Sequence, residues 1–183
     1  MKAIYILIIL VIVIFGAYAA YGTLAKKAAA DKPSAPVPAA SKPAEKAPDF
    51  TVTDQKGSKV SFSSMLGKPV IVNIWATWCG PCKMELPDFQ KASLKYSDRI
   101  TFMMVNLTTG DETEQTVRKF MKDNGYTFPV YYDTEQSADG AYQVTGIPTT
   151  IFIDAEGNIV SKQIGMLSGE ELQEGIDSLL REP

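Results

Sequence analysis

The sequence predicts an α/β fold: a central mixed β-sheet flanked by helices, with an added β-hairpin at its N-terminal end. Short apolar runs alternate with longer segments of helical periodicity in the middle of the chain, as expected where helices join parallel strands. Near the C-terminus, two β-type runs are separated by a tight turn, which indicates an antiparallel pair. With 183 residues, 45% of them hydrophobic, the chain can bury the core of one such domain.

The first predicted element is the hairpin. Residues Pro48–Val52 and Lys59–Phe62 alternate apolar and polar side chains around the turn sequence Asp54-Gln55-Lys56-Gly57. Gly57 supplies the positive φ that a tight turn needs. We therefore expect two short antiparallel strands ahead of the main sheet.

Two strand and helix pairs follow in alternation. Val70–Trp75 is a short apolar run typical of a buried strand, and Ile100–Leu107 is apolar nearly throughout, as in a strand covered on both faces. Helices are expected over residues 79–96, with Leu86, Phe89 and Leu94 pointing inward, and over residues 112–124, with Val117, Phe120 and Met121 on one face. Pro87 should kink the first helix or remove one of its hydrogen bonds, and Gly125 is a suitable cap for the end of the second.

The C-terminal part completes the sheet. A strand is expected over Val130–Asp133 and a short helix near Ala138–Tyr142, followed by a strand-forming segment, Val144–Asp154. The turn over residues 155–158 leads back into Ile159–Ile164. Ser168 and Glu171 have the spacing of a capping box and predict a last helix, whose apolar face holds Leu172, Ile176, Leu179 and Leu180.

Two segments precede the predicted domain, which we place at residues 48–183. Residues 1–25 include an uncharged stretch, residues 3–25, as long as the roughly 20 residues that cross a bilayer as a helix, and we expect a membrane anchor there. A cleaved signal sequence is the alternative, because Ala17-Tyr18-Ala19 has the form of a cleavage site. Residues 26–47 are rich in Ala, Pro, Lys and Ser and predict an extended linker.

The predicted domain is acidic. Residues 48–183 contain 12 Lys and Arg against 19 Asp and Glu, a net charge of about −7, whereas the linker is about +3. An acidic domain on a basic linker is not typical of a nucleic-acid-binding protein.

The two cysteines of the chain lie in one short segment, Trp78-Cys79-Gly80-Pro81-Cys82, which follows the strand Val70–Trp75. A Cys-x-x-Cys sequence that begins a helix places its first sulfur where unpaired N–H groups and the helix dipole favour a thiolate. A zinc site would need further Cys or His ligands, and the chain has no histidine. A purely structural disulfide is a poor alternative because so short a loop restricts the unfolded chain weakly. The pattern predicts thiol-disulfide exchange.

The roles of the residues in this motif follow from their positions. Cys79, at the start of the helix, is the expected attacking sulfur, and Cys82 is the resolving thiol that releases the product. Trp78 is expected to form an apolar rim beside Cys79, with a plain core aromatic as the alternative. Gly80 and Pro81 shape the turn, although a proline early in a helix needs no special function.

Two further residues are candidates for the site. Glu85, three residues beyond Cys82, shares its helix face and can accept the proton of that thiol; its negative charge would also raise the pKa of the thiol. A solvated helix residue is the alternative. Pro148 lies where a proline is either tolerated at a strand start or forms a cis bond in a tight turn.

The chain resembles the TlpA/ResA group of membrane-tethered thiol-disulfide oxidoreductases, within the thioredoxin-fold superfamily. The resemblance covers about residues 48–180. Its landmarks are Ala47-Pro48-Asp49-Phe50, the run from Val72 to Cys82, Glu85-Leu86-Pro87 and Gly146-Ile147-Pro148-Thr149.

This resemblance implies a thioredoxin-like fold and several roles. Pro148 would be cis and lie against the disulfide, so that Ile147 and its backbone line a peptide-binding groove. Asn73 stands where thioredoxins have a buried aspartate, and Glu85 fills the place of a glutamate typical of the group. The redox-active disulfide of Cys79 and Cys82 would serve without any cofactor or metal. Gly80-Pro81 is the thioredoxin dipeptide, whereas many members have a bulkier or acidic residue in place of Gly80, and a fairly reducing potential is implied.

We expect an extracytoplasmic, membrane-anchored reductase of protein disulfides, with its N-terminus in the cytoplasm. Substrates with cysteine pairs, such as apocytochrome c before haem attachment, are the expected partners. Because the chain has no third cysteine, a separate membrane thiol oxidoreductase must supply its electrons. The alternative is a tethered oxidase that forms disulfides in secreted proteins with the same residues.

Other classes fit the sequence less well. A copper metallochaperone would need Cys-x-x-x-Cys and a distant histidine. A peroxidase would need a proline and a hydroxyl residue ahead of its cysteine, where this chain has Val72 and Ala76. A non-catalytic binding module remains open, although it would have no use for both cysteines.

Overall fold

The computed structural model describes residues 45–181, and we refer to these as the described domain. The predicted anchor over residues 1–25, and the predicted linker up to residue 44, lie outside that range. Among the helices of residues 45–181, none combines the length and the apolar character needed to span a bilayer.

Seven strands of the described domain form one mixed sheet, in the spatial order β2-β1-β5-β4-β3-β6-β7. The strands are β1 (Thr51–Thr53), β2 (Lys59–Ser61), β3 (Val70–Trp75), β4 (Thr101–Asn106), β5 (Val130–Tyr132), β6 (Thr149–Ile153) and β7 (Ile159–Ile164). The β3, β4 and β5 strands are parallel to one another, whereas β6 is antiparallel to β3 and β7 is antiparallel to β6. The hairpin of β1 and β2 joins the sheet through β5. The predicted mixed sheet with an added hairpin is confirmed.

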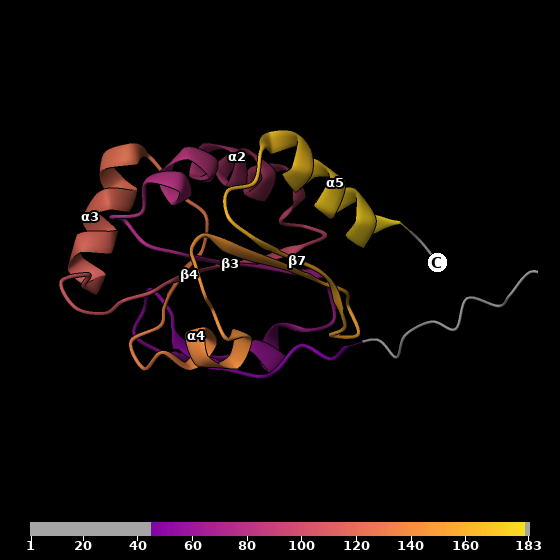
Figure 1. Cartoon of the computed structure of the whole chain (residues 1–183), viewed down its shortest axis with the longest axis horizontal. Coiled ribbons are helices and arrows are strands. Elements are labelled where there is room, and N and C mark those ends of the chain that lie inside the picture. The colour runs from indigo at the N-terminus through magenta and orange to yellow at the C-terminus, as the bar shows by residue number, and fades with distance from the viewer. Residues whose placement is uncertain (1–44, 182–183) are drawn as a thin grey trace, which may run out of the picture. The chain divides into compact units, whose positions relative to one another are not determined.

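Helices cover both faces of this sheet (Figure 1). On one face lie α2 (Gly80–Tyr96), α3 (Glu114–Asn124) and α5 (Gly169–Leu180), and on the other lies α4 (Ser137–Tyr142). A 3-10 turn, η1 (Phe62–Met65), which the sequence analysis did not predict, follows β2.

The central strand β3 explains why its sequence is apolar throughout. Ile71 and Trp75 face the core under α2, α3 and α5, whereas Val70, Val72 and Ile74 face the second core, under α4 and the hairpin. Successive side chains of a strand point to opposite faces, so a strand between two cores needs apolar residues at nearly every position. Asn73 is the polar exception in β3, and it is fully buried.

Most predicted elements are present, but several details were wrong. Leu94 does not point inward: its side chain is 71% exposed. The buried residues of α2 include Cys82, Leu86, Phe89 and Tyr96, which repeat at helical spacing, and Leu94 falls outside that stripe. The predicted strand over Val144–Asp154 begins only at Thr149, after Pro148, which has no N–H to donate to a ladder.

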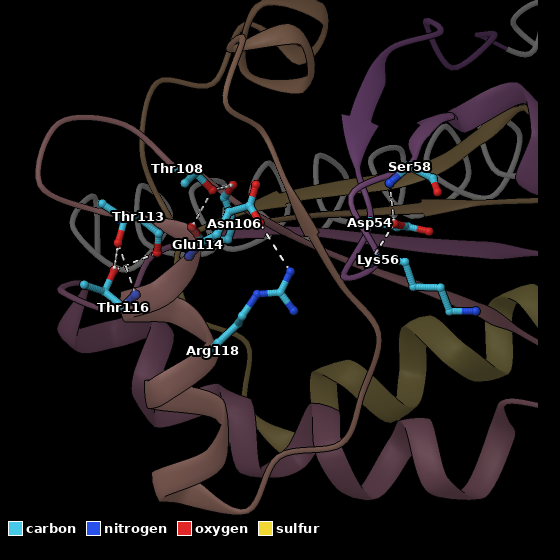
Figure 2. Close-up of polar contacts among 9 residues, drawn as sticks. All are labelled: Asp54, Lys56, Ser58, Asn106, Thr108, Thr113, Glu114, Thr116 and Arg118. Carbon is cyan, nitrogen blue, oxygen red and sulfur yellow. Dashed lines mark hydrogen bonds and ion pairs between the residues drawn. The ribbon is translucent and has the colours of Figure 1, made fainter.

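The boundaries of α3 also differ from the prediction. The helix begins at Glu114, because Thr113 caps it: the Thr113 hydroxyl accepts from the N–H of Thr116 in a capping box (Figure 2). Glu112 is therefore a loop residue and not the first residue of the helix. The predicted C-cap is confirmed, since Gly125 has a φ of 68°.

Backbone contacts of the described domain start ahead of Pro48. Lys46 forms an isolated antiparallel bridge with Asn158, the N–H of Ala47 donates to Gly157, and the carbonyl of Glu45 accepts from Ile159. Composition assigns residues 45–47 to the linker, but it does not report on hydrogen bonds made to a distant turn.

Candidate active site

The Cys-x-x-Cys sequence lies at the junction of β3 and α2. Cys79 is the N-cap residue of α2, and its sulfur accepts a contact from the backbone N–H of Cys82 at 3.2 Å. The two cysteines form a disulfide, with their Cα atoms 5.3 Å apart. Cys79 retains 5% exposure and Cys82 none, so Cys79 is the sulfur that a substrate can reach first. The described structure is thus the oxidised state.

Trp78 directly precedes Cys79, and the segment Ile147-Pro148 contacts the sulfur of Cys79, with Pro148 itself buried. Trp78 is 64% exposed, which excludes the alternative of a core aromatic. The Ile147–Pro148 peptide bond is cis, and the carbonyl oxygen of Ile147 lies 3.7 Å from the sulfur of Cys79. The carbonyl of Pro148 accepts from the N–H of Gly165, which holds the chain after β7 beside this segment.

Glu85 is one of the most deeply buried charged residues of the described domain, with 1% exposure. One carboxylate oxygen accepts from the Asn73 side-chain amide at 2.7 Å, and the other accepts from the backbone N–H of Leu167 at 2.9 Å. The Asn73 amide also donates to the hydroxyl of Thr150, its partner across β3 and β6, at 3.0 Å. The alternative of a solvated helix residue is therefore wrong.

Burial determines the acid–base character of Glu85. Removal from water raises the pKa of its carboxyl to about 7, although the hydrogen bonds from Leu167 and Asn73 act in the opposite direction. Near neutral pH, Glu85 can therefore both accept and release a proton. Cys82 lies one turn earlier on the same buried face of α2, so its thiol is the nearest candidate along the helix for that exchange.

Another buried carboxylate, Glu112, contacts Thr77 just ahead of the motif and was missed by the sequence analysis. It accepts from the backbone N–H of Thr77 at 2.7 Å, from the Thr77 hydroxyl at 2.5 Å and from the Asn106 side-chain amide at 2.9 Å. Thr108 in turn donates to the Asn106 side chain, as Figure 2 shows. No spacing rule could have found these contacts, because Glu112 and Thr77 are 35 residues apart.

The remaining predicted residues occupy positions that shape the motif. Gly80 and Pro81 form the first turn of α2, where the missing N–H of the proline has no helical acceptor to lose. Asn73, predicted as a shaping residue, is brought to Glu85. Within residues 45–181, no group of three or more His, Cys, Asp or Glu side chains is arranged to hold a metal ion.

Comparison with known proteins places this site in a family. The profile of the AhpC/TSA family matches residues 43–162. Among curated proteins, the chain is 34% identical over 133 residues to the thioredoxin-like protein YneN of Bacillus subtilis (strain 168), covering 73% of this chain and 78% of that protein. It is 36% identical over 129 residues to the thiol-disulfide oxidoreductase ResA of Bacillus anthracis, covering 70% of this chain and 73% of that protein.

Solved structures show the same likeness. The structure of StoA from Bacillus subtilis superimposes with a TM-score of 0.62 at 31% identity, covering 71% of this chain and 97% of that one. A thiol:disulfide interchange protein of the thioredoxin family from Chlorobium tepidum TLS superimposes with a TM-score of 0.67 at 30% identity, covering 78% of this chain and 100% of that one. The fold of this chain is thus shared with proteins that are named for thiol-disulfide exchange.

Proposed function

We propose that this chain reduces disulfides of proteins outside the cytoplasm. The chain belongs to the AhpC/TSA family and is a thiol-disulfide oxidoreductase of the ResA type. The observation that carries the proposal is the Cys79–Cys82 disulfide at the N-terminus of α2. The carbonyl of Ile147, just before the cis bond to Pro148, lies 3.7 Å from the sulfur of Cys79, and the buried Glu85 follows Cys82 by one turn on α2.

The reaction begins from the reduced form. The Cys79 thiolate attacks one sulfur of a substrate disulfide, the substrate S–S bond breaks, and the departing sulfur leaves as a thiolate. Cys82 then attacks the sulfur of Cys79 in the mixed disulfide. That bond breaks, the Cys79–Cys82 disulfide forms, and the substrate leaves with both of its sulfurs reduced. Two electrons pass to the substrate in each cycle.

Glu85 is the proposed base in the second step. Its carboxylate takes the proton of the Cys82 thiol, which must be lost before that sulfur can attack. The Asn73 side chain can form a hydrogen bond with Glu85 in both its ionised and its protonated state. Its amide nitrogen donates to the ionised carboxylate, and rotation of the amide by half a turn would present its oxygen, which has no partner within the described domain, to protonated Glu85.

The substrate-binding residues we propose are Trp78, Ile147 and Pro148. Trp78 is exposed and directly precedes the nearly buried Cys79, so its ring can bind a segment of a substrate protein. A large aromatic ring buries much apolar area at little cost in conformational freedom. The carbonyl of Ile147 and the backbone before Pro148 offer hydrogen-bonding groups to an extended peptide.

Residues 1–25 are proposed to anchor the protein in the membrane, with the N-terminus in the cytoplasm and the described domain outside it. The part of the predicted linker ahead of the described domain, residues 26–44, would then hold the domain away from the bilayer surface. We propose apocytochrome c with an oxidised cysteine pair as a substrate, and a membrane thiol oxidoreductase as the electron donor. The substrate is proposed from the resemblance to the TlpA/ResA group, and the donor from the absence of a third cysteine in the chain.

The reduction potential of the cysteine pair tests this proposal. The purified chain is equilibrated at pH 7 with dithiothreitol or glutathione buffers, and the fraction of disulfide is measured by thiol alkylation. A value near the roughly −270 mV of thioredoxin, or lower, is expected for a reductase. A value near the roughly −120 mV of DsbA would overturn the direction of electron flow and make the chain an oxidase of secreted proteins.

A further inference from the structure

We propose that Glu112 is a positioning residue for disulfide exchange: its buried carboxylate holds the loop that presents Trp78 and Cys79 to the substrate. This inference rests on the proposed function, since it assigns a part of the molecule to the binding of a protein substrate. Glu112 lies far from the cysteines in the sequence, and within the described domain its side chain forms no hydrogen bond to either of them.

The contacts of Glu112 match a carboxylate. Three donors converge on it: the N–H and hydroxyl of Thr77 and the side-chain amide of Asn106. A carboxylate only accepts hydrogen bonds, and hydrogen bonds to a charged acceptor are stronger than those between neutral groups. With 6% exposure, Glu112 is shielded from water that would compete for these donors.

These contacts begin where the sheet ends. The β3 and β4 ladder runs in register up to Trp75 and Asn106, and the carbonyl of Trp75 still accepts from the N–H of Leu107. Two residues later, the N–H of Thr77 has left the sheet and donates to Glu112 instead. This N–H is only partly exposed to water and still needs a partner, so Glu112 takes the place of the missing strand partner.

The position of Thr77 links this contact to the active site. Thr77 directly precedes Trp78, whose largely exposed side chain has little core packing to orient it, so the ring depends on the backbone behind it. Cys79 follows, and its own N–H donates to the carbonyl of Ala76 at 3.3 Å. Holding Thr77 therefore restricts both the aromatic rim and the first sulfur.

Two substitutions separate the geometry of Glu112 from its charge. Glu112→Gln retains one oxygen for the N–H of Thr77 and the Asn106 amide, while its NH₂ group can donate to the Thr77 hydroxyl. Glu112→Ala removes all three contacts. Glu114→Ala is the matched control, because Glu114 lies two residues further on, half-exposed, and is paired with Arg118 at 3.3 Å (Figure 2).

The first measurement is the reduction of insulin disulfides by the full chain, with dithiothreitol as the electron source. For Glu112→Ala we expect kcat/KM to fall about tenfold, mainly through KM, because the three hydrogen bonds that orient the substrate site are lost. Reduction of the small 2-hydroxyethyl disulfide should change less than about twofold, because it makes few contacts with the rim. Glu112→Gln and Glu114→Ala should remain close to the wild type for both substrates.

The second measurement does not depend on activity. Hydrogen exchange of the Thr77 amide, followed by NMR, should be slow in the wild type and in Glu112→Gln, and at least about tenfold faster in Glu112→Ala. If the wild type fails to reduce insulin, the proposed function fails, but this exchange rate still decides whether Glu112 holds the loop. If Glu112→Ala does not fold, Thr77→Val against Thr77→Ser repeats the comparison with and without the hydroxyl.

Two results would overturn the inference. Equal impairment of Glu112→Gln and Glu112→Ala would show that the charge acts and not the hydrogen-bonded geometry. Unchanged insulin kinetics and unchanged Thr77 exchange in folded Glu112→Ala would show that the loop holds its position without Glu112.

Discussion

Glu85 illustrates how much a single residue depends on its surroundings. Its spacing from Cys82 placed it on the correct helix face, and a role as a proton acceptor could be argued from that spacing. Its partners Asn73 and Leu167 are 12 and 82 residues away, and only the fold brings them to its carboxylate. The resulting burial raises the pKa of Glu85 to about 7, which makes the proposed proton transfer from Cys82 feasible.

The raised pKa predicts how stability depends on pH. The pKa of Glu85 is about 7 in the folded chain, against an ordinary value of 4.5. At pH values between these two, the Glu85 carboxyl is ionised in the unfolded chain but still protonated in the folded one, so the stability of the fold falls as pH rises. Below about pH 4.5 both states are protonated and this loss is absent. Glu85→Gln lacks this ionisation. As the pH rises from about 4.5 to about 8, we therefore expect its unfolding free energy to increase, relative to that of the wild type, by up to about 3 kcal/mol.

Urea unfolding of the oxidised protein at several pH values checks this expectation. Glu174→Gln, which changes an exposed carboxylate of α5, serves as the control and should alter stability little. A difference between Glu85→Gln and the wild type that stays constant from about pH 4.5 to about pH 8 would contradict the raised pKa.

The division of labour between the cysteines gives a second prediction at this scale. In Cys82→Ala, the attack by Cys79 can occur but the resolving step cannot, so a mixed disulfide with the substrate should accumulate. Non-reducing gel electrophoresis after incubation with an oxidised substrate protein should show the adduct, and dithiothreitol should remove it. Cys79→Ala should show much less adduct, since Cys82 is fully buried. A non-catalytic binding module would form no such adduct.

At the scale of elements, the close approach of α5 to the sheet depends on one glycine. A Cβ atom at Gly175 would lie only 2.2 Å from the ring of Phe152 on β6. Because Phe152 is buried, its ring has little room to move. The helix can therefore approach the strand this closely only without a side chain at residue 175.

Replacement of this glycine should destabilise the domain. We expect Gly175→Ala to lose about 1–3 kcal/mol of unfolding free energy, as for an overpacked core. The matched control is Gly140→Ala in α4, where a Cβ would have nothing within 4 Å. Since alanine is the better helix former, this control should leave stability unchanged or raise it by up to about 1 kcal/mol. Thermal unfolding followed by circular dichroism distinguishes the two, and equal melting temperatures would refute the packing argument.

At the scale of the whole molecule, the proposed site lies where segments from both halves of the sheet meet. The motif follows β3, Glu112 follows β4, and Pro148 precedes β6, which is antiparallel to β3. All three therefore lie at the same end of these central strands. In open α/β sheets, ligands bind at the carboxyl ends of the parallel strands. Every residue to which we assign a role in catalysis or substrate binding lies within residues 45–181.

A shortened chain tests the separation of catalysis from tethering. A chain that begins at residue 45 should have the same reduction potential as the full chain, because the site and its supporting contacts are retained. After expression with the same export signal, the full chain should remain with membranes through carbonate washing and the shortened chain should not. Recovery of both chains in the soluble fraction would contradict the proposed anchor.

The sequence by itself determined the alternation of strands and helices, the hairpin, the redox pair at a helix start and the shared helix face of Cys82 and Glu85. These features arise from periodicity and spacing within a few residues, which local physical rules can interpret. Only the tertiary structure decided the order of the strands, the exposure of Leu94, and the partners of Glu85 and Glu112. The contacts of Glu85 with Asn73 and Leu167, and of Glu112 with Thr77, join residues 12 to 82 positions apart, and they exist because β3 lies between β4 and β6 in the folded sheet.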